Sequence, residues 1–169
     1  ASPHSMSSIP VTIYALAHPD ELRTIIYLNP VGFETDGRPA KYVGRIGPCA
    51  LQEILPGFVK NEFKGHRNLM TAMKVGKHLF GNAIHTAGEI ITCHAADLRE
   101  DVVMLGELGV KRAILLGEKD GLVPAQPSFE GAGHLVDHCK IIEGIDHFGP
   151  QKQPSEIAAL EGAILHQFS

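Results

Sequence analysis

The sequence predicts an α/β fold in which a parallel sheet carries an inserted helical segment. Three short runs, at residues 24–28, 112–116 and 139–142, are mainly apolar and do not alternate with polar residues. This pattern is typical of strands that helices cover on both faces, as in a parallel sheet. Stretches of helical pattern lie between these runs, which is the alternation that favours the α/β class.

The composition is that of one ordinary globular domain. The chain has 169 residues, of which 44% are hydrophobic and 20% charged, and its length suffices to bury a core. The net charge of -4 and the lack of a basic run predict no nucleic-acid partner. No apolar run approaches the length of a bilayer, so we expect no membrane span. The composition does not determine the oligomeric state.

The cysteines and histidines give no sign of a disulfide framework or a metal site. Cys49, Cys93 and Cys139 are far apart and form no C-x-x-C pair, which favours reduced thiols in a cytoplasmic protein. His134 and His138 have the i, i+4 spacing that can bind a metal on a helix, but no third ligand accompanies them. We therefore expect no metal.

One helix between the first two predicted strands has recognisable boundaries. Asp97 is a candidate N-cap with Glu100 as its capping-box partner, and Gly109 is the expected stop. The spacing predicts one apolar stripe that faces the core. Its members are Leu98, Val102, Leu105 and Leu108.

Two further helices follow the second and third predicted strands. One begins near Pro127, and the last begins near Pro154, because proline is favoured in the first turn. The apolar positions expected near Pro127 are Phe129, Leu135 and Val136, and those of the last helix are Ile157, Leu160, Ile164 and Phe168.

The middle of the chain differs from its two ends. A loop-rich stretch opens it, and three amphipathic segments follow at residues 51–58, 68–80 and 83–94, with no strand pattern. We interpret residues 34–95 as an all-helical insertion and residues 1–33 with 96–169 as the α/β core. An insertion of this kind can act as a lid over a site.

Three chemically reactive residue types are expected at one edge of the sheet. Asp120 follows the second predicted strand, and His147 follows the third. Ser5 precedes a helix that leads into the first strand. Sites in open α/β sheets form at the carboxyl ends of the strands, so the three side chains can converge there.

Each of the three residues also has an ordinary structural interpretation. Ser5 alone could be a helix cap, Asp120 a turn residue before glycine, and His147 a loop histidine. Together they match one catalytic system. A serine hydroxyl needs a base, an imidazole can serve as that base near neutral pH, and a buried carboxylate fixes its tautomer. The chain order Ser, Asp, His is that of the nucleophile-elbow enzymes.

Several motifs resemble the C-terminal part of an α/β-hydrolase fold enzyme. PHSMSS stands where that family has its G-x-S-x-G elbow, and HPDELRTIIYLNPVGF resembles the helix end and strand that come after the elbow. GEKDGLVP resembles the loop of the family's acid, and DHFGPQKQPSEIAALEGAIL resembles its histidine loop and last helix. The resemblance implies that Ser5 is the nucleophile, His147 the general base and Asp120 the orienting acid. It also implies a cofactor-free serine hydrolase of small ester-like substrates, with the inserted helices as its lid.

The chain departs from the family pattern at the elbow and before it. Pro3 and Ser7 replace the two elbow glycines, which relieve crowding at a strained turn. The backbone N–H of Met6 is the expected oxyanion donor, whereas the family's second donor comes from a loop that precedes the elbow. The family also has strands before the elbow, so we expect this chain to be a fragment of a longer protein or a decayed copy.

Two other functions remain open at the level of sequence. The same triad cleaves carbon–carbon bonds of diketone-like acids in relatives. A chain without the first half of the fold could also be a non-catalytic remnant or a binding module, because a fold does not prove an activity. A serine at the elbow argues against the dehalogenase and epoxide-hydrolase branches, which use aspartate there.

Overall fold

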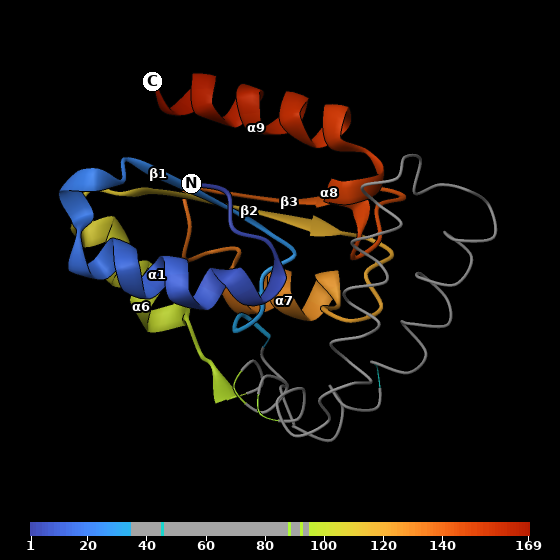
Figure 1. Ribbon diagram of the computed structural model, residues 1–169, viewed down its shortest axis with the longest axis horizontal. Coiled ribbons are helices and arrows are strands. Elements are labelled where there is room, and N and C mark those ends of the chain that lie inside the picture. The colour runs from blue at the N-terminus through green and yellow to red at the C-terminus, as the bar shows by residue number, and fades with distance from the viewer. Residues whose placement is uncertain (35–44, 46–87, 89–91, 93–94) are drawn as a thin grey trace.

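A computed structural model describes residues 1–34, 45, 88, 92 and 95–169, which form three layers (Figure 1). Helix α9 covers one face of a parallel sheet, and helices α1, α6 and α7 cover the other. The elements in chain order are η1 (Ser5–Ser7), α1 (Ser8–Ala17), η2 (Pro19–Glu21), β1 (Thr24–Leu28), α6 (Arg99–Glu107), β2 (Lys111–Gly117), α7 (Ala125–Ala132), β3 (His138–Ile142), α8 (Gly149–Lys152) and α9 (Pro154–Phe168).

The sheet has the order β1-β2-β3, and both pairs of neighbouring strands are parallel. The three predicted strands are therefore confirmed, with β2 longer by one residue at each end and β3 by one at its start. The N-terminal segment lies beside β1 in the same direction. The Leu28 N–H donates to the Pro3 carbonyl over 2.9 Å, and His4 forms a parallel bridge to Leu28. This pairing delivers Ser5 to the carboxyl edge of the sheet.

Most of β1 and β2 is apolar because both faces of these two strands are covered. Alternate residues of β1 and β2 point to opposite layers, as the pleat of a strand requires. Ile25, Tyr27, Ile114 and Leu116 belong to the cluster shared with α1, α6 and α7. The residues between them belong to the cluster shared with α9, and they are Ile26, Leu28, Ala113 and Leu115.

The helices predicted in the described part of the chain exist, but some of their details were wrong. Helix α6 begins at Arg99 with Leu98 at the N-cap and no side-chain capping bond, so the capping box of Asp97 and Glu100 is wrong. The Asp97 carboxylate instead accepts the Arg99 N–H over 3.2 Å. Gly109 follows the helix end with a φ of +85°, as expected for a stop.

Two of the predicted apolar stripes were partly wrong. In the stripe of α6, Leu108 is 48% exposed, whereas Leu98, Val102 and Leu105 are buried. Helix α7 buries its small residues and leaves Phe129 39% exposed, and Leu135 and Val136 come after its end. The stripe of α9 is confirmed, because Ile157 and Ile164 are buried and Leu160 and Phe168 pack against the same cluster.

The predicted lid, residues 34–95, lies almost entirely outside the described residues, so the domain division stays a prediction. This applies to all three amphipathic segments within it, and to Cys49 and Cys93. In the described part of the chain, no helix combines the length and hydropathy that crossing a membrane requires.

Candidate active site

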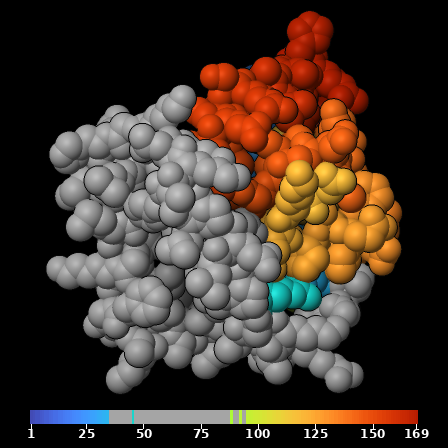
Figure 2. Space-filling model, turned by 90° about the vertical axis from the view of Figure 1, so that its right-hand side faces the viewer, coloured from blue at the N-terminus to red at the C-terminus, as the bar shows by residue number. Residues whose placement is uncertain are grey.

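The structure brings Ser5, Asp120 and His147 together at the carboxyl edge of the sheet. Figure 2 looks onto this edge, where the segment that follows β2 is yellow to orange and the segment that follows β3 lies beside it in orange-red. The three side chains come from the elbow after the N-terminal segment, the loop after β2 and the loop after β3. This is the arrangement expected of a parallel α/β sheet.

Ser5 occupies a sharp turn between the extended N-terminal segment and α1. Its φ is +54°, in the left-handed region that a side chain with a Cβ adopts only under strain. The buried Ser8 hydroxyl supports this turn by donating to the Ser5 carbonyl over 2.6 Å. The turn therefore holds the Ser5 hydroxyl toward the His147 imidazole, and its shape resembles a nucleophile elbow.

The two residues that replace the elbow glycines fit this turn. Ser7 braces it, because its Oγ accepts the His4 N–H and donates to the His4 carbonyl, each over 2.8 Å. Pro3 is buried and takes part in the pairing with β1 through its carbonyl. A proline has no N–H to donate, and this pairing uses only its acceptor.

Asp120 is held rigidly in the loop after β2. Its Oδ1 accepts the N–H groups of Leu122 and Val123 over 2.8 and 2.7 Å. Its Oδ2 lies 2.7 Å from the Nδ1 atom of His147. Asp120 is only 5% exposed as a residue, and these bonds satisfy its carboxylate in the protein interior. One oxygen thus fixes the carboxylate, while the other faces the imidazole.

His147 connects the acid to the serine. Its Nε2 lies 3.0 Å from the Ser5 Oγ, while its Nδ1 faces Asp120. A carboxylate can only accept, so the proton at this contact belongs to Nδ1, and the Nε2 lone pair accepts the serine O–H. The residue is 2% exposed, which limits competition from water. These bonds form one continuous path from the serine hydroxyl to the buried carboxylate.

Asn29 supports this path from the end of β1, and sequence reasoning missed it. Its Oδ1 accepts the Gly117 N–H over 2.6 Å, and its Nδ2 donates to the carbonyls of Asp146 and His147 over 3.2 and 3.4 Å. The residue is buried and has a φ of +43°. Its side chain therefore ties the ends of β1 and β2 to the histidine loop.

Gly117 allows the same loop to approach β2 closely. A Cβ at this position would lie 2.6 Å from the Ile145 carbonyl oxygen, which is closer than real contacts permit. The Lys119 N–H donates to that carbonyl over 2.8 Å. A residue with a side chain at position 117 would therefore push away the loop that carries His147.

His4 packs between the elbow and the histidine loop. Its ring centroid lies 5.0 Å from that of His147, and its Nε2 lies 2.8 Å from the His147 carbonyl oxygen. Burial and the neighbouring His147 ring lower the pKa of His4 to about 4. The imidazole is therefore neutral at physiological pH.

Met6 follows Ser5 in the first turn after the elbow. Met6 is the second residue of η1, and the first N–H groups of a helix have no partner within that helix. Met6 is 39% exposed and directly follows Ser5 in the chain.

The histidines at positions 134 and 138 do not lie on one helix, although their i, i+4 spacing would permit it. His134 follows the end of α7, and His138 begins β3. Among the residues that the structure describes, no group of three or more possible ligands lies together as a metal site would require. Burial raises the pKa of the Cys139 thiol to about 11, which leaves it protonated and unreactive.

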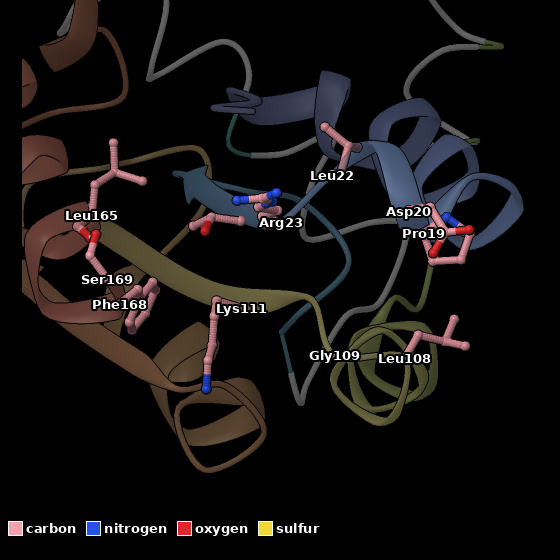
Figure 3. Close-up of a pocket in the computed structure, with 11 residues that line it drawn as sticks. Pro19, Asp20, Leu22, Arg23, Leu108, Gly109, Lys111, Leu165, Phe168 and Ser169 are labelled. Atoms are coloured by element: carbon pink, nitrogen blue, oxygen red, sulfur yellow. The ribbon is translucent and has the colours of Figure 1, made fainter.

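A separate hollow lies at the opposite edge of the sheet. It measures about 630 Å³ and includes Thr24 and Lys111, the first residues of β1 and β2 (Figure 3). Residues of η2 and the end of α9 complete its wall. This hollow is remote from Ser5, which lies beyond the other ends of the strands.

Comparisons with known proteins identify the fold. No protein-family model matches the chain, and no curated protein matches its sequence. Among solved structures, the chain is similar to an esterase from Thermogutta terrifontis, with 17% identity and a TM-score of 0.61 over 99% of this chain and 64% of that one. It is also similar to a membrane phospholipase A described as a bacterial virulence factor, with 15% identity and a TM-score of 0.67 over 99% of this chain and 56% of that one.

A third similar structure is that of a single-site mutant of an epoxide hydrolase from Bacillus megaterium. The identity is 13% and the TM-score 0.62, over 98% of this chain and 68% of the other. The chain therefore has the α/β-hydrolase fold, as the sequence predicted. It spans 56 to 64% of the length of the first two of these proteins.

Proposed function

Since the chain has the α/β-hydrolase fold, we propose that it carries the active site of a serine hydrolase that acts on small ester-like substrates. One observation supports this most strongly. The Ser5 Oγ lies 3.0 Å from the His147 Nε2, and the His147 Nδ1 lies 2.7 Å from the Asp120 Oδ2. Such a geometry is what a nucleophile, its base and an orienting acid require.

The proposed reaction starts with proton transfer from Ser5 to His147. The serine oxygen attacks the substrate carbonyl as the His147 Nε2 takes its proton, and Asp120 stabilises the imidazolium that forms. His147 then gives this proton to the leaving alcohol, and an acyl-enzyme remains on Ser5. Water hydrolyses the acyl-enzyme with the same base, which regenerates the serine. The reaction as proposed needs no cofactor.

The N–H of Met6 is the proposed donor to the oxyanion. A second donor is usual in such sites, and the loss of one typically lowers the rate by about 10²–10³. In the α/β-hydrolase pattern this second donor comes from a segment that precedes the elbow. The predicted helices at residues 34–95 are the proposed lid, which would shape the substrate pocket and exclude water.

The experiment is the hydrolysis of p-nitrophenyl esters of increasing acyl length. The intact chain should release p-nitrophenol above the spontaneous rate, and Ser5→Ala should abolish this release. Ser2→Ala is the matched control, because Ser2 is an exposed serine close by in the same segment. Equal rates for the chain and Ser5→Ala would contradict the proposal and favour a non-catalytic binding module.

A further inference from the structure

We propose that His4 is a positioning residue, which fixes the backbone of His147 at the distance from Ser5 that proton transfer requires. The inference rests on the proposed function, because it names a further residue on which the same site depends.

The hydrogen bonds of His4 determine which of its nitrogens carries the proton. Its Nε2 lies 2.8 Å from the His147 carbonyl oxygen, which can only accept. The proton is therefore on Nε2, and Nδ1 is the acceptor. The Gln151 amide nitrogen lies 3.4 Å from this Nδ1 and can donate to it. Both nitrogens of His4 are thus engaged with the segment that carries His147.

This arrangement joins the elbow and the histidine loop at two neighbouring points. Ser5 contacts the imidazole of His147, and the residue before it contacts the carbonyl of His147. Asn29 also donates to this carbonyl, but over the longer distance of 3.4 Å. Without the donor of His4, we expect the His147 backbone to move away from the elbow, so that the contact between Nε2 and Oγ lengthens.

The same contacts distinguish His4 from the base. The Nε2–H of His4 donates a hydrogen bond to a carbonyl, whereas the Nε2 of His147 faces the Ser5 hydroxyl. The low pKa of His4 keeps its ring neutral near pH 7, so that its Nδ1 can accept from Gln151. His4 therefore acts through His147 and exchanges no proton with the substrate.

Three substitutions separate this role from simple packing. His4→Gln retains a donor, because the glutamine Nε2 occupies nearly the position of the imidazole Nε2. His4→Asn carries the same amide but is shorter by one methylene, so its donor does not reach the carbonyl. His4→Met has about the same length as glutamine and no donor. His4→Asn also keeps the test valid if His4→Met fails to fold, because it leaves a polar residue in place.

The assay is labelling of the full chain with a fluorophosphonate, followed by intact mass at several probe concentrations. We expect His4→Asn and His4→Met to lower the maximal labelling rate by about tenfold or more, since misplacing a reacting group by about 1 Å can cost about 10²-fold. The probe concentration at half-maximal rate should stay unchanged, and His4→Gln should stay within about threefold of the wild type. Proton NMR of the His147 Nδ1–H gives a second readout, which should shift or broaden in His4→Asn and not in His4→Gln.

Two results would overturn the inference. One is a folded His4→Asn that labels at the wild-type rate with an unchanged Nδ1–H resonance, and the other is a His4→Gln that loses as much rate as His4→Asn. Failure of the proposed function would look different, because the wild-type chain itself would then take no label. In that case His147 is not a reactive base that His4 could position, and both the proposed function and this inference are wrong.

Discussion

Replacing Asn29 by alanine should destabilise the chain strongly, because one buried side chain serves three backbone groups. The Gly117 N–H would lose its acceptor at 2.6 Å, and an unsatisfied buried donor costs about 1–3 kcal/mol. The φ of +43° adds a second cost of about 1 kcal/mol, since asparagine tolerates the left-handed region better than alanine does. The carbonyls of Asp146 and His147 also lose a donor. We expect a total of about 3–4 kcal/mol, a large part of the roughly 5–15 kcal/mol that stabilises a domain.

Urea unfolding followed by circular dichroism measures this loss, and two further substitutions separate its causes. Asn29→Gly removes the side chain without the backbone penalty, so it should be more stable than Asn29→Ala by about 1 kcal/mol. Asn29→Asp retains the acceptor for Gly117 but turns a carboxylate toward two carbonyls. A loss below about 1 kcal/mol in Asn29→Ala would refute the assigned role of this side chain.

Three further predictions concern the acid, the backbone near it and the pH dependence of stability. Asp120→Asn should lower fluorophosphonate labelling by about 10⁴-fold with little change in the unfolding midpoint, because its amide would favour the wrong tautomer of His147; labelling within tenfold of the wild type would contradict this. Gly117→Ala should lower both the unfolding midpoint and labelling, because its Cβ would meet the Ile145 carbonyl at 2.6 Å; an unchanged rate and midpoint would argue against the close approach. The pKa of His4 is about 4 in the folded chain and 6.5 in the unfolded chain. Between these two pH values the unfolded chain binds more protons than the folded chain. The free energy of unfolding should therefore fall as the pH drops from 6.5 to 4. Urea unfolding at pH 7 and pH 4 measures how much of the free energy of unfolding is lost between these pH values. This loss should be larger in the wild type than in His4→Gln by up to about 3 kcal/mol. Equal losses in the two proteins would contradict the low pKa assigned to His4.

The location of the site could be predicted because it depends on a general property of parallel sheets. Ser5, Asp120 and His147 each follow an extended segment, and parallel strands bring their carboxyl ends to one edge. The apolar runs identified those strands. Residue type and chain order were therefore sufficient to predict which side chains would meet.

Asn29 and His4 could not be assigned in the same way, because their roles depend on backbone contacts between distant parts of the chain. Asn29 precedes a proline, which in a sequence indicates only a turn. Its partner Gly117 is 88 residues away. The contact of His4 with the His147 carbonyl likewise spans 143 residues. A local sequence pattern gives no indication of a hydrogen bond between residues so far apart in the chain.

The errors in the helices have local physical causes. Leu108 was placed on the apolar stripe by helical periodicity, but the helix ends at Glu107, and the periodicity no longer holds after that residue. Phe129 was expected inside because it is large and apolar. Helix α7 packs against β2 and β3 through Gly131 and Ala132 instead, since small residues permit a close approach to a sheet.

The measurement that tests the account most directly is intact-mass analysis of the chain after reaction with a fluorophosphonate. The hydrogen-bonded path from Ser5 through His147 to Asp120 predicts one adduct per chain, located on Ser5 by peptide mapping. Ser5→Ala should remove the adduct, and Ser2→Ala should retain it. A folded chain that takes no label, or that is labelled equally in Ser5→Ala, would contradict the claim that this elbow carries a nucleophile.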